Sequence, residues 1–208
     1  AGPLVGPAVD RAASRLREWG WEPVLGRNTR GRQGYLSGSD EERLADLQAA
    51  IDADDNDAIW CLRGGYGTMR IIDRIDWRPL LRRPRPVIGF SDNTVLHLAL
   101  RRLGIVSFHG PHPSVVDLPS FSTDLLPRLV SDPATLGLLP FPNPGERGET
   151  LVEGVAEGAL LGGNLVLLGA TLGTEWSLQA EGTLLFIEEV GEATYRIDRL
   201  LTQLRLAD

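Results

Sequence analysis

The chain contains no lysine, and all 21 of its basic residues are arginines. This absence excludes a lysine-dependent phosphate loop and a Schiff-base lysine from these 208 residues. The 28 acidic residues outnumber the arginines and give a net charge of -7 at pH 7. A surplus of negative charge gives no electrostatic support for binding to nucleic acid or to an anionic membrane, and we expect neither as a partner.

Cysteine and long apolar runs are also scarce. The single cysteine, Cys61, cannot form a disulfide within the chain, which favours a reducing compartment, and we expect a cytoplasmic location. Its position in an apolar run predicts a buried, small hydrophobic residue. No run approaches the ~20 apolar residues that a helix needs to cross a bilayer, and no signal peptide is recognisable.

Short apolar runs alternate with helical patterns along the chain. Helices are predicted over residues 8–19, 41–51, 95–103 and 197–204, and the capping box Ser39-Asp40-Glu41-Glu42 opens the second of them. Strands are predicted at residues 22–25, 58–62, 86–90, 106–108 and 184–187, with a further helix through Met69, Ile71 and Ile72. This alternation predicts an α/β fold whose N-terminal domain is a parallel sheet with helices on both faces.

The length allows one large domain or two small ones. Residues 139–149 hold three prolines and two glycines with few apolar side chains, which is typical of a linker. We therefore predict an N-terminal domain over residues 1–138, a linker over 139–157 and the start of a C-terminal α/β domain over 158–208.

The segment Pro86-Val87-Ile88-Gly89-Phe90-Ser91-Asp92-Asn93-Thr94 is the most informative part of the sequence. It predicts a strand, a sharp turn and a helix, with a serine hydroxyl at the corner. In several serine hydrolases this geometry exposes the nucleophile near the positive end of a helix. Ser, Asp, Asn and Thr are also the preferred N-cap residues, so the segment alone leaves Ser91 as either a nucleophile or a helix cap.

A second turn, Arg63-Gly64-Gly65-Tyr66-Gly67, follows the strand predicted at residues 58–62. In parallel sheets, ligands bind beyond the carboxyl ends of the strands, and both turns lie at such ends. The glycines could bring backbone N–H groups up to an anion, but they lack the spacing of a dinucleotide site. The alternative is a plain tight turn. A backbone N–H of this turn would act as an oxyanion-hole donor only if Ser91 is a nucleophile.

Two carboxylates, Glu188 and Glu189, end the strand predicted at residues 184–187. Successive strand residues face opposite sides, so one of them can point into a site while the other points away. Two interpretations remain, a solvated strand end or a carboxylate that orients a histidine base.

The three histidines give no metal template. His97 is interpreted as a packing or surface residue of its helix, His109 as part of a turn, and His112 as part of an exposed loop between two prolines. Their spacings of 12 and 3 residues match no familiar ligand pattern, and we predict no metal site.

Taken together, several segments resemble the LD-carboxypeptidase family of serine peptidases, which includes the microcin-immunity peptidases. The similar segments are Tyr35-Leu36-Ser37-Gly38-Ser39-Asp40-Glu41-Glu42-Arg43, Ile59-Trp60-Cys61-Leu62-Arg63-Gly64-Gly65-Tyr66-Gly67, Ile88-Gly89-Phe90-Ser91-Asp92-Asn93-Thr94, Leu161-Gly162-Gly163-Asn164-Leu165, Leu185-Phe186-Ile187-Glu188-Glu189 and Tyr195-Arg196-Ile197-Asp198-Arg199. Their order along nearly the whole chain makes the resemblance specific, although no single segment would.

The resemblance implies a Ser-Glu-His triad. Ser91 matches the nucleophile and Glu188 the triad carboxylate, with Glu189 as the alternative, while the backbone N–H groups of Gly65 and Asp92 would form the oxyanion hole. It also implies that no metal or organic cofactor is used and that the protein forms a homodimer. The implied reaction is hydrolysis of an amide between an L-centre and a terminal D-amino acid, releasing D-alanine from a murein tetrapeptide.

Two departures from the family matter. The family's catalytic histidine lies well beyond the position of Glu188, and none of the three histidines here matches it. The family's opening strand precedes the position of Ala1. We therefore expect this chain to be an internal piece with an incomplete C-terminal domain, poorly stable and nearly inactive alone. Two alternatives remain, an immunity-type peptidase that cleaves peptidyl- or aminoacyl-nucleotide toxins and a non-catalytic remnant.

Overall fold

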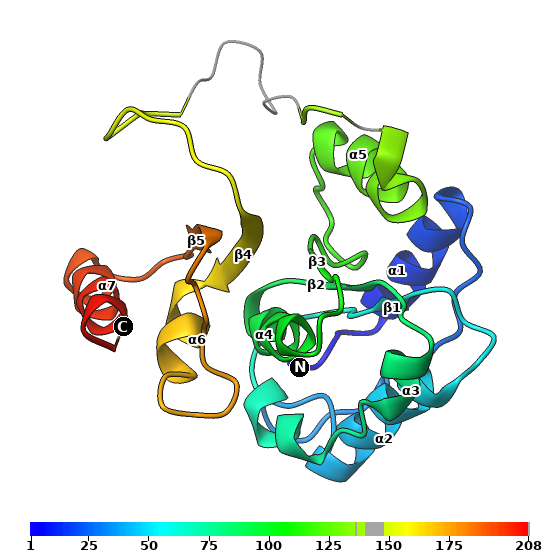
Figure 1. Cartoon of the computed structure of the whole chain (residues 1–208). Coiled ribbons are helices and arrows are strands. Elements are labelled where there is room, and N and C mark those ends of the chain that lie inside the picture. Colours follow the sequence, from blue (N-terminus) through cyan, green and yellow to red (C-terminus); the bar gives the residue numbers. More distant parts are fainter. Residues whose placement is uncertain (136, 140–147, 208) are drawn as a thin grey trace.

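Three short parallel strands form the sheet of the N-terminal part, in the order β1 (Ile59–Trp60), β2 (Val87–Gly89) and β3 (Phe108–His109). The structure is a computed structural model that describes residues 1–135, 137–139 and 148–207 (Figure 1). Val87 and Ile88 are both buried and face opposite sides of the sheet, so each belongs to a different hydrophobic core.

The larger core lies on the Val87 face of the sheet. Three helices cover this face: α2 (Asp40–Asp52), α3 (Arg78–Arg82) and α4 (Thr94–Arg102). Each of them contributes at least one fully buried side chain, including Ile51, Leu80 and Val95. Burial of each such side chain stabilises the fold by ~1.5–3 kcal/mol.

The Ile88 face packs against α5 (Ser120–Ser131) through Leu126 and Val130. Trp19, which follows α1 (Pro7–Glu18), stacks on Trp60 of β1 with ring centroids 5.4 Å apart. Helices therefore cover both faces of a parallel sheet, which confirms the predicted α/β class.

A second parallel pair follows, β4 (Ala159–Asn164) and β5 (Thr183–Glu188), with α6 (Leu165–Ala170) and α7 (Thr194–Ala207). This unit packs on α4, because Leu98 of α4 shares a core with Leu161 and Leu168. Figure 1 shows α4 between the three-stranded sheet and this unit. The helix that begins at the Ser91 turn therefore touches both parts of the chain.

Two predicted elements are wrong. Residues 22–25 form no strand: they lie outside both sheets and Val24 is 91% exposed, so neither ladder partners nor packing hold them extended. The helix expected after Gly67 is a pair of 3-10 turns, η1 (Thr68–Arg70) and η2 (Ile72–Arg74). The two turns meet at Ile71, whose φ of -125° is not helical.

The predicted linker at residues 139–157 lies partly outside the described residues. From 148 to 158 the chain forms neither helix nor strand. Within the part of the chain that the structure describes, no helix has both the length and the apolar character needed to cross a membrane.

The capping box at the start of α2 is confirmed. The Glu42 amide donates to Ser39 Oγ at 3.1 Å, and the Ser39 amide donates to the Glu42 carboxylate at 2.8 Å. Because α2 carries part of the larger core, the loss of this cap should lower the stability of the whole N-terminal part.

We expect Ser39→Ala to lower the free energy of unfolding by about 1 kcal/mol, because one helix N–H loses its acceptor. Denaturant titration followed by circular dichroism measures the change. Ser14→Ala, at an exposed position inside α1, is the matched control and should shift stability by less than about 0.5 kcal/mol. Equal effects in the two variants would contradict the capping role.

Candidate active site

Ser91 lies at the sharp turn between β2 and α4. Phe90 is extended, Ser91 adopts φ 63°, and the 3-10 turn η3 (Ser91–Asn93) then leads into α4. Among the described residues, Ser91 is the only non-glycine with a positive φ. That conformation costs roughly 1–2 kcal/mol for an L-residue, and such strain persists at sites where the surrounding structure enforces it.

The helix-cap interpretation of Ser91 does not fit this geometry. The N-cap positions of η3 and α4 are Phe90 and Asn93, and neither side chain makes a capping hydrogen bond. Ser91 is half-buried at the corner itself.

The glycine-rich turn lies directly against Ser91. A Cβ at Gly64 would lie 2.7 Å from Ser91 Cβ and 3.0 Å from Ser91 Oγ, so only glycine permits this approach. Gly65 adopts φ 100°, which also favours glycine. In the described chain, the backbone N–H groups of Gly65 and Asp92 donate no hydrogen bond. The structure therefore leaves the two predicted oxyanion-hole donors without internal acceptors, on the two turns that meet at Ser91.

The side chain of Asp92 holds these two turns together. It is 1% exposed and accepts hydrogen bonds from the Thr68 amide at 2.9 Å and the Thr68 hydroxyl at 2.7 Å. Thr68 follows Gly67 at the start of η1, so one buried carboxylate ties the glycine-rich turn to the Ser91 turn. Hydrogen bonds to a charged group contribute roughly 1.5–3 kcal/mol each.

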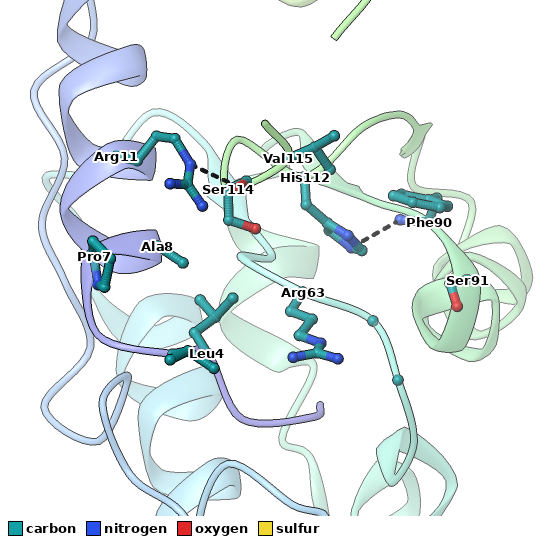
Figure 2. A pocket seen from close by; sticks show the side chains of 13 residues that line it. Leu4, Pro7, Ala8, Arg11, Arg63, Phe90, Ser91, His112, Ser114 and Val115 are labelled. Atoms are coloured by element: carbon teal, nitrogen blue, oxygen red, sulfur yellow. Dashed lines mark hydrogen bonds between the residues drawn. The ribbon is translucent and has the colours of Figure 1, made fainter. Parts of the chain in front are cut away.

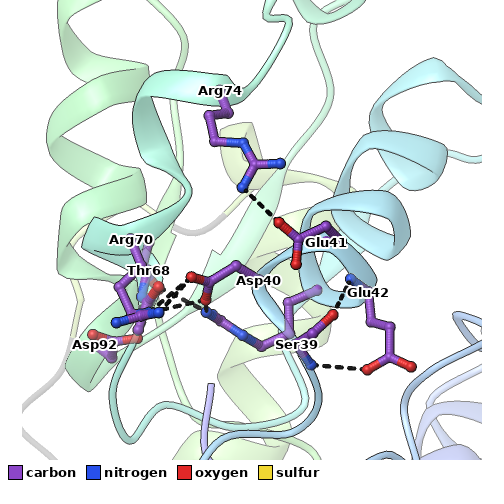
Figure 3. Close-up of polar contacts among 10 residues, drawn as sticks. Ser39, Asp40, Glu41, Glu42, Thr68, Arg70, Arg74 and Asp92 are labelled. Carbon is purple, nitrogen blue, oxygen red and sulfur yellow. Dashed lines mark hydrogen bonds and ion pairs between the residues drawn. The ribbon is translucent and has the colours of Figure 1, made fainter.

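Arg43 anchors the other side of the glycine-rich turn. Its guanidinium donates to the Gly67 carbonyl at 3.0 Å and to the Asp40 carboxylate of the α2 N-terminus. Arg70 binds the same carboxylate through three contacts of 2.6–3.0 Å (Figure 3). Hydrogen bonding by Arg70 lowers the pKa of Asp40 to about 2, so the carboxylate stays ionised and holds both arginines.

His112 packs against the Ser91 turn. The prediction that it lies in an exposed loop is wrong. It is 4% exposed and stacks on Phe90, with ring centroids 4.3 Å apart. Its Nε2 lies 3.0 Å from Asn93 Nδ2 and 3.4 Å from the Phe90 amide. Both neighbours are donors, so Nε2 acts as the acceptor and the ring is neutral; burial lowers its pKa to about 4.

The other two histidines are also packed behind Ser91. His97 is 6% exposed, with its Nε2 2.7 Å from the Gly89 carbonyl and its Nδ1 2.8 Å from Ser107 Oγ, so both ring nitrogens are occupied. His109 ends β3 and lies between His97 and Phe186, at centroid distances of 5.7 and 5.1 Å. Burial lowers the pKa of His109 to about 4.

Glu188 and Glu189 have different environments. Glu188 Oε1 is buried without a hydrogen bond and lies 3.7 Å from His109 Nε2. Burial raises the pKa of Glu188, a side-chain hydrogen bond with Asn164 offsets part of this effect, and the adjacent charge of Glu189 adds to it. Glu189 instead accepts hydrogen bonds from the Val166 amide at 3.2 Å and the Val190 amide at 2.8 Å. Glu189 therefore stabilises the start of α6, whereas Glu188 faces the histidines.

One hydrogen bond connects the Glu188 strand to the Ser91 helix. Asn164 of β4 is the register partner of Glu188, and its amide donates to Thr94 Oγ1 at 3.0 Å. Thr94 is the first residue of α4, three positions after Ser91. The structure thus brings Glu188 and Ser91 to the same region through Asn164 and Thr94.

An open cavity of about 510 Å³ borders Ser91. Figure 2 shows apolar side chains such as Leu4, Ala8 and Val115 on its wall, together with Arg11 and Arg63. Gly64, Gly65 and His112 complete the side nearest Ser91. A ligand in this cavity would reach the serine hydroxyl and the Gly65 amide together.

Other chemistry finds little support in the described residues. No cluster of three or more histidine, cysteine or acidic side chains there could hold a metal ion. Cys61 is near the site, but burial raises the pKa of its thiol to about 12. A thiol with that pKa carries very little thiolate at neutral pH, which disfavours Cys61 as a nucleophile.

The sequence did not reveal the roles of Thr68, Arg43 and the three histidines. These contacts join residues 19 to 24 positions apart in some cases and 8 to 10 in others, and no local pattern encodes them. The sequence holds two signals for these roles. One is Thr68, the polar residue after Gly67, and the other is the clustering of the three histidines within residues 97–112.

Both parts of the chain match known family profiles. The profile of the LD-carboxypeptidase N-terminal domain matches residues 1–110, and that of the LD-carboxypeptidase C-terminal domain matches residues 157–208. The chain therefore belongs to the LD-carboxypeptidase family, which confirms the resemblance seen in the sequence.

Individual relatives agree with the family assignment. The chain is 40% identical to the "Probable murein peptide carboxypeptidase" of Bacillus subtilis, over 95% of this chain and 62% of that protein. The crystal structure of muramoyltetrapeptide carboxypeptidase from Oxalobacter formigenes is similar with a TM-score of 0.84 and 29% identity, over 99% of this chain and 69% of that one. The microcin C7 self-immunity protein of Escherichia coli is 27% identical, over 94% and 65%. The chain thus spans about two thirds of the length of these proteins.

The buried neutral histidines predict a pH dependence of stability. For a histidine whose pKa is about 6.5 unfolded and about 4 folded, the unfolded state binds more protons between these values. Stability should therefore be complete above pH 6.5 and fall as the pH drops from 6.5 towards 4.

His112→Gln tests this dependence, because glutamine does not titrate and keeps a polar side chain. The difference in the free energy of unfolding between pH 7 and pH 5, from denaturant titration, should be smaller in the variant than in the parent chain. An unchanged difference would contradict the neutral, buried state of His112.

Proposed function

We propose that this protein is a serine carboxypeptidase that cleaves the amide between an L-centre and a terminal D-amino acid, releasing D-alanine from murein tetrapeptides. The observation that carries the proposal is the left-handed backbone of Ser91, at the end of a parallel strand and beside an open cavity. The printed names of the Bacillus and Oxalobacter relatives support the murein-peptide substrate class.

In the proposed reaction, Ser91 Oγ attacks the carbonyl carbon of the scissile amide. The developing oxyanion accepts hydrogen bonds from the N–H groups of Gly65 and Asp92, which have no other acceptor in the described chain. A general base takes the serine proton and later returns it to the leaving amine of the D-amino acid. Water then releases the acyl group from Ser91.

The general base is a histidine other than the three seen here. His97 uses both ring nitrogens, and His112 Nε2 accepts from the Ser91 turn. His109, with a pKa of about 4, is a weak base at neutral pH. The relatives are longer than the matched region, which leaves room for a base that these residues do not include.

Glu188 is the carboxylate that would orient this base. Its Oε1 has no hydrogen-bond partner in the described structure, so it can accept a hydrogen bond from an incoming imidazole. Glu189 is less suited, because both of its carboxylate oxygens already accept backbone hydrogen bonds.

Ser91→Ala in the complete natural polypeptide should lower D-alanine release from a murein tetrapeptide by ~10⁴- to 10⁶-fold, the range for loss of a triad nucleophile. Release is measured by chromatography of the products. Ser14→Ala, on the exposed face of α1, serves as the control and should retain activity. Retention of activity by the Ser91 variant would refute the proposal.

The two glutamates are separated by a second pair of variants. Glu188→Gln should reduce kcat by roughly 10⁴-fold, by analogy with loss of a triad carboxylate. Glu189→Gln should act mainly on stability, since it weakens the hydrogen bonds at the start of α6. Initial rates and thermal unfolding of both variants give the comparison, and a reversed order would make Glu189 the triad member.

The similarity to the microcin C7 self-immunity protein supports a second candidate, a peptidase for peptidyl- or aminoacyl-nucleotide toxins. The Ser91 turn would serve either substrate. Parallel assays with a murein tetrapeptide and an aminoacyl-nucleotide sulfamoyl analogue carrying a cleavable amide would distinguish them by kcat/KM. If neither substrate is hydrolysed by the complete polypeptide, a non-catalytic role is favoured.

A further inference from the structure

We propose that Arg63 binds the terminal carboxylate of the residue that the enzyme releases. This inference rests on the proposed function and adds the residue that restricts the site to chain ends. It makes Arg63 a specificity-determining residue, in contact with the leaving group and not with the reacting carbonyl.

The position of Arg63 relative to Ser91 is fixed by the glycine-rich turn. Arg63 is followed in the chain by Gly64 and Gly65. Gly64 contacts Ser91, and the Gly65 amide is one of the two proposed oxyanion donors. Figure 2 shows Arg63 between Leu4 and Ser91, with its side chain in the cavity. In the released α-amino acid, the carboxylate carbon is three bonds from the scissile carbonyl carbon. The distance between these two carbons is shorter than the ~3.8 Å between consecutive Cα atoms. The carboxylate of the released residue must therefore lie close to the Gly64–Ser91 contact, and Arg63 is the charged lining residue next to that contact in the chain.

The charge of the cavity favours an anion. None of the 13 residues that line it is acidic, while Arg11 and Arg63 are both present. A neighbouring cavity of about 740 Å³ shares Arg63 and Gly65, adds Arg30 and Arg32, and also has no acidic lining residue. In a chain of net charge -7, this is a local concentration of positive charge beside the candidate nucleophile, which raises the local concentration of an anionic substrate.

The guanidinium of Arg63 has N–H groups that form no hydrogen bond within the described residues. One nitrogen, Nη1, donates to the Pro3 carbonyl. No carboxylate of the described residues forms an ion pair with Arg63, and the side chain is exposed. An arginine has five N–H donors in a planar fork, so the Nε and Nη2 edge can bind both oxygens of a carboxylate.

The other arginines of the two cavities are less suited. Arg11 donates its Nε to the Ser114 carbonyl and is half-buried on α1. Arg30 is paired with Asp10 through two hydrogen bonds of 2.5 and 3.3 Å. Arg32 lines only the cavity that does not include Ser91. Among the arginines that line these two cavities, only Arg63 lines both, and it is next in the chain to Gly64, which contacts Ser91.

The experiment compares two substrates that differ only at the chain end. The complete natural polypeptide is given a murein tetrapeptide with a free terminal carboxylate and the same peptide as a C-terminal carboxamide. A carboxamide cannot form the ion pair, so the parent enzyme should prefer the free acid by about 10- to 100-fold in kcat/KM. Arg63→Gln should remove most of this preference by slowing only the free acid.

Two further variants make the result specific. Arg63→Lys keeps a positive charge without the planar fork and should retain part of the preference. Arg27→Gln, at an exposed arginine outside both cavities, should retain all of it. Equal slowing of both peptides by Arg63→Gln would mean that Arg63 only supports the turn, and it would overturn the proposal, as would an unchanged preference.

A binding measurement separates this proposal from the proposed function. If the parent enzyme cleaves neither peptide, the proposed function fails, and the carboxylate site is judged by titration of N-acetyl-D-alanine followed by NMR. Binding that Arg63→Gln weakens by about tenfold or more would sustain the site. Binding that is absent, or equal in the two proteins, would refute it.

Discussion

The buried carboxylate of Asp92 is the contact on which the arrangement of the candidate site depends. Through Thr68 it fixes the distance between two turns that follow different strands, and those turns carry Ser91, Gly64 and Gly65. A buried carboxylate is stable only when its oxygens are hydrogen-bonded, so the contact restrains both turns at once. The strained φ of Ser91 can persist because its neighbour in sequence is held in this way.

Further contacts on both sides of Asp92 hold the two turns beside Ser91 in place. His112 and Asn93 hold Phe90 on one side of the turn. Arg43, with Asp40, holds Gly67 on the other. Several of the polar groups behind Ser91 are therefore hydrogen-bonded to one another, while the amides of Gly65 and Asp92 donate no hydrogen bond within the described residues. Backbone donors that are left free beside a nucleophile are preorganised for a negatively charged oxygen.

Local patterns predicted those features that depend on neighbouring residues. The apolar spacing of Val9, Ala12 and Leu16 determines α1 within one residue, and the Ser39 capping box marks the start of α2. The Ser91 turn was equally visible, because an apolar strand and a helical pattern flank it. The nucleophile and cap interpretations could not be separated from sequence, since they differ in one φ angle that the surroundings impose.

Features that depend on distant residues were not predictable in the same way. The two prolines around His112 suggested an exposed loop, yet the chain folds back so that its ring covers Phe90. The segment at residues 22–25 had the composition of a strand but lacks a ladder partner in the described sheets. The difference between Glu188 and Glu189 likewise arises from contacts with Asn164 of β4 and Val166 of α6, which lie more than 20 residues earlier in the chain.

The absence of lysine has a consequence for how pH acts on this site. A guanidinium keeps its proton throughout the range in which proteins work, whereas a lysine ammonium in a cavity can lose it. Arg11 and Arg63 therefore present a positive charge to the cavity that does not vary with pH, whereas burial lowers the pKa of His112, which lines the same cavity, to about 4. Attraction of an anionic substrate by these arginines would therefore stay constant over the pH range in which a general base gains or loses its proton. The acid limb of a pH–rate profile would report on the group that transfers the proton and not on the arginines.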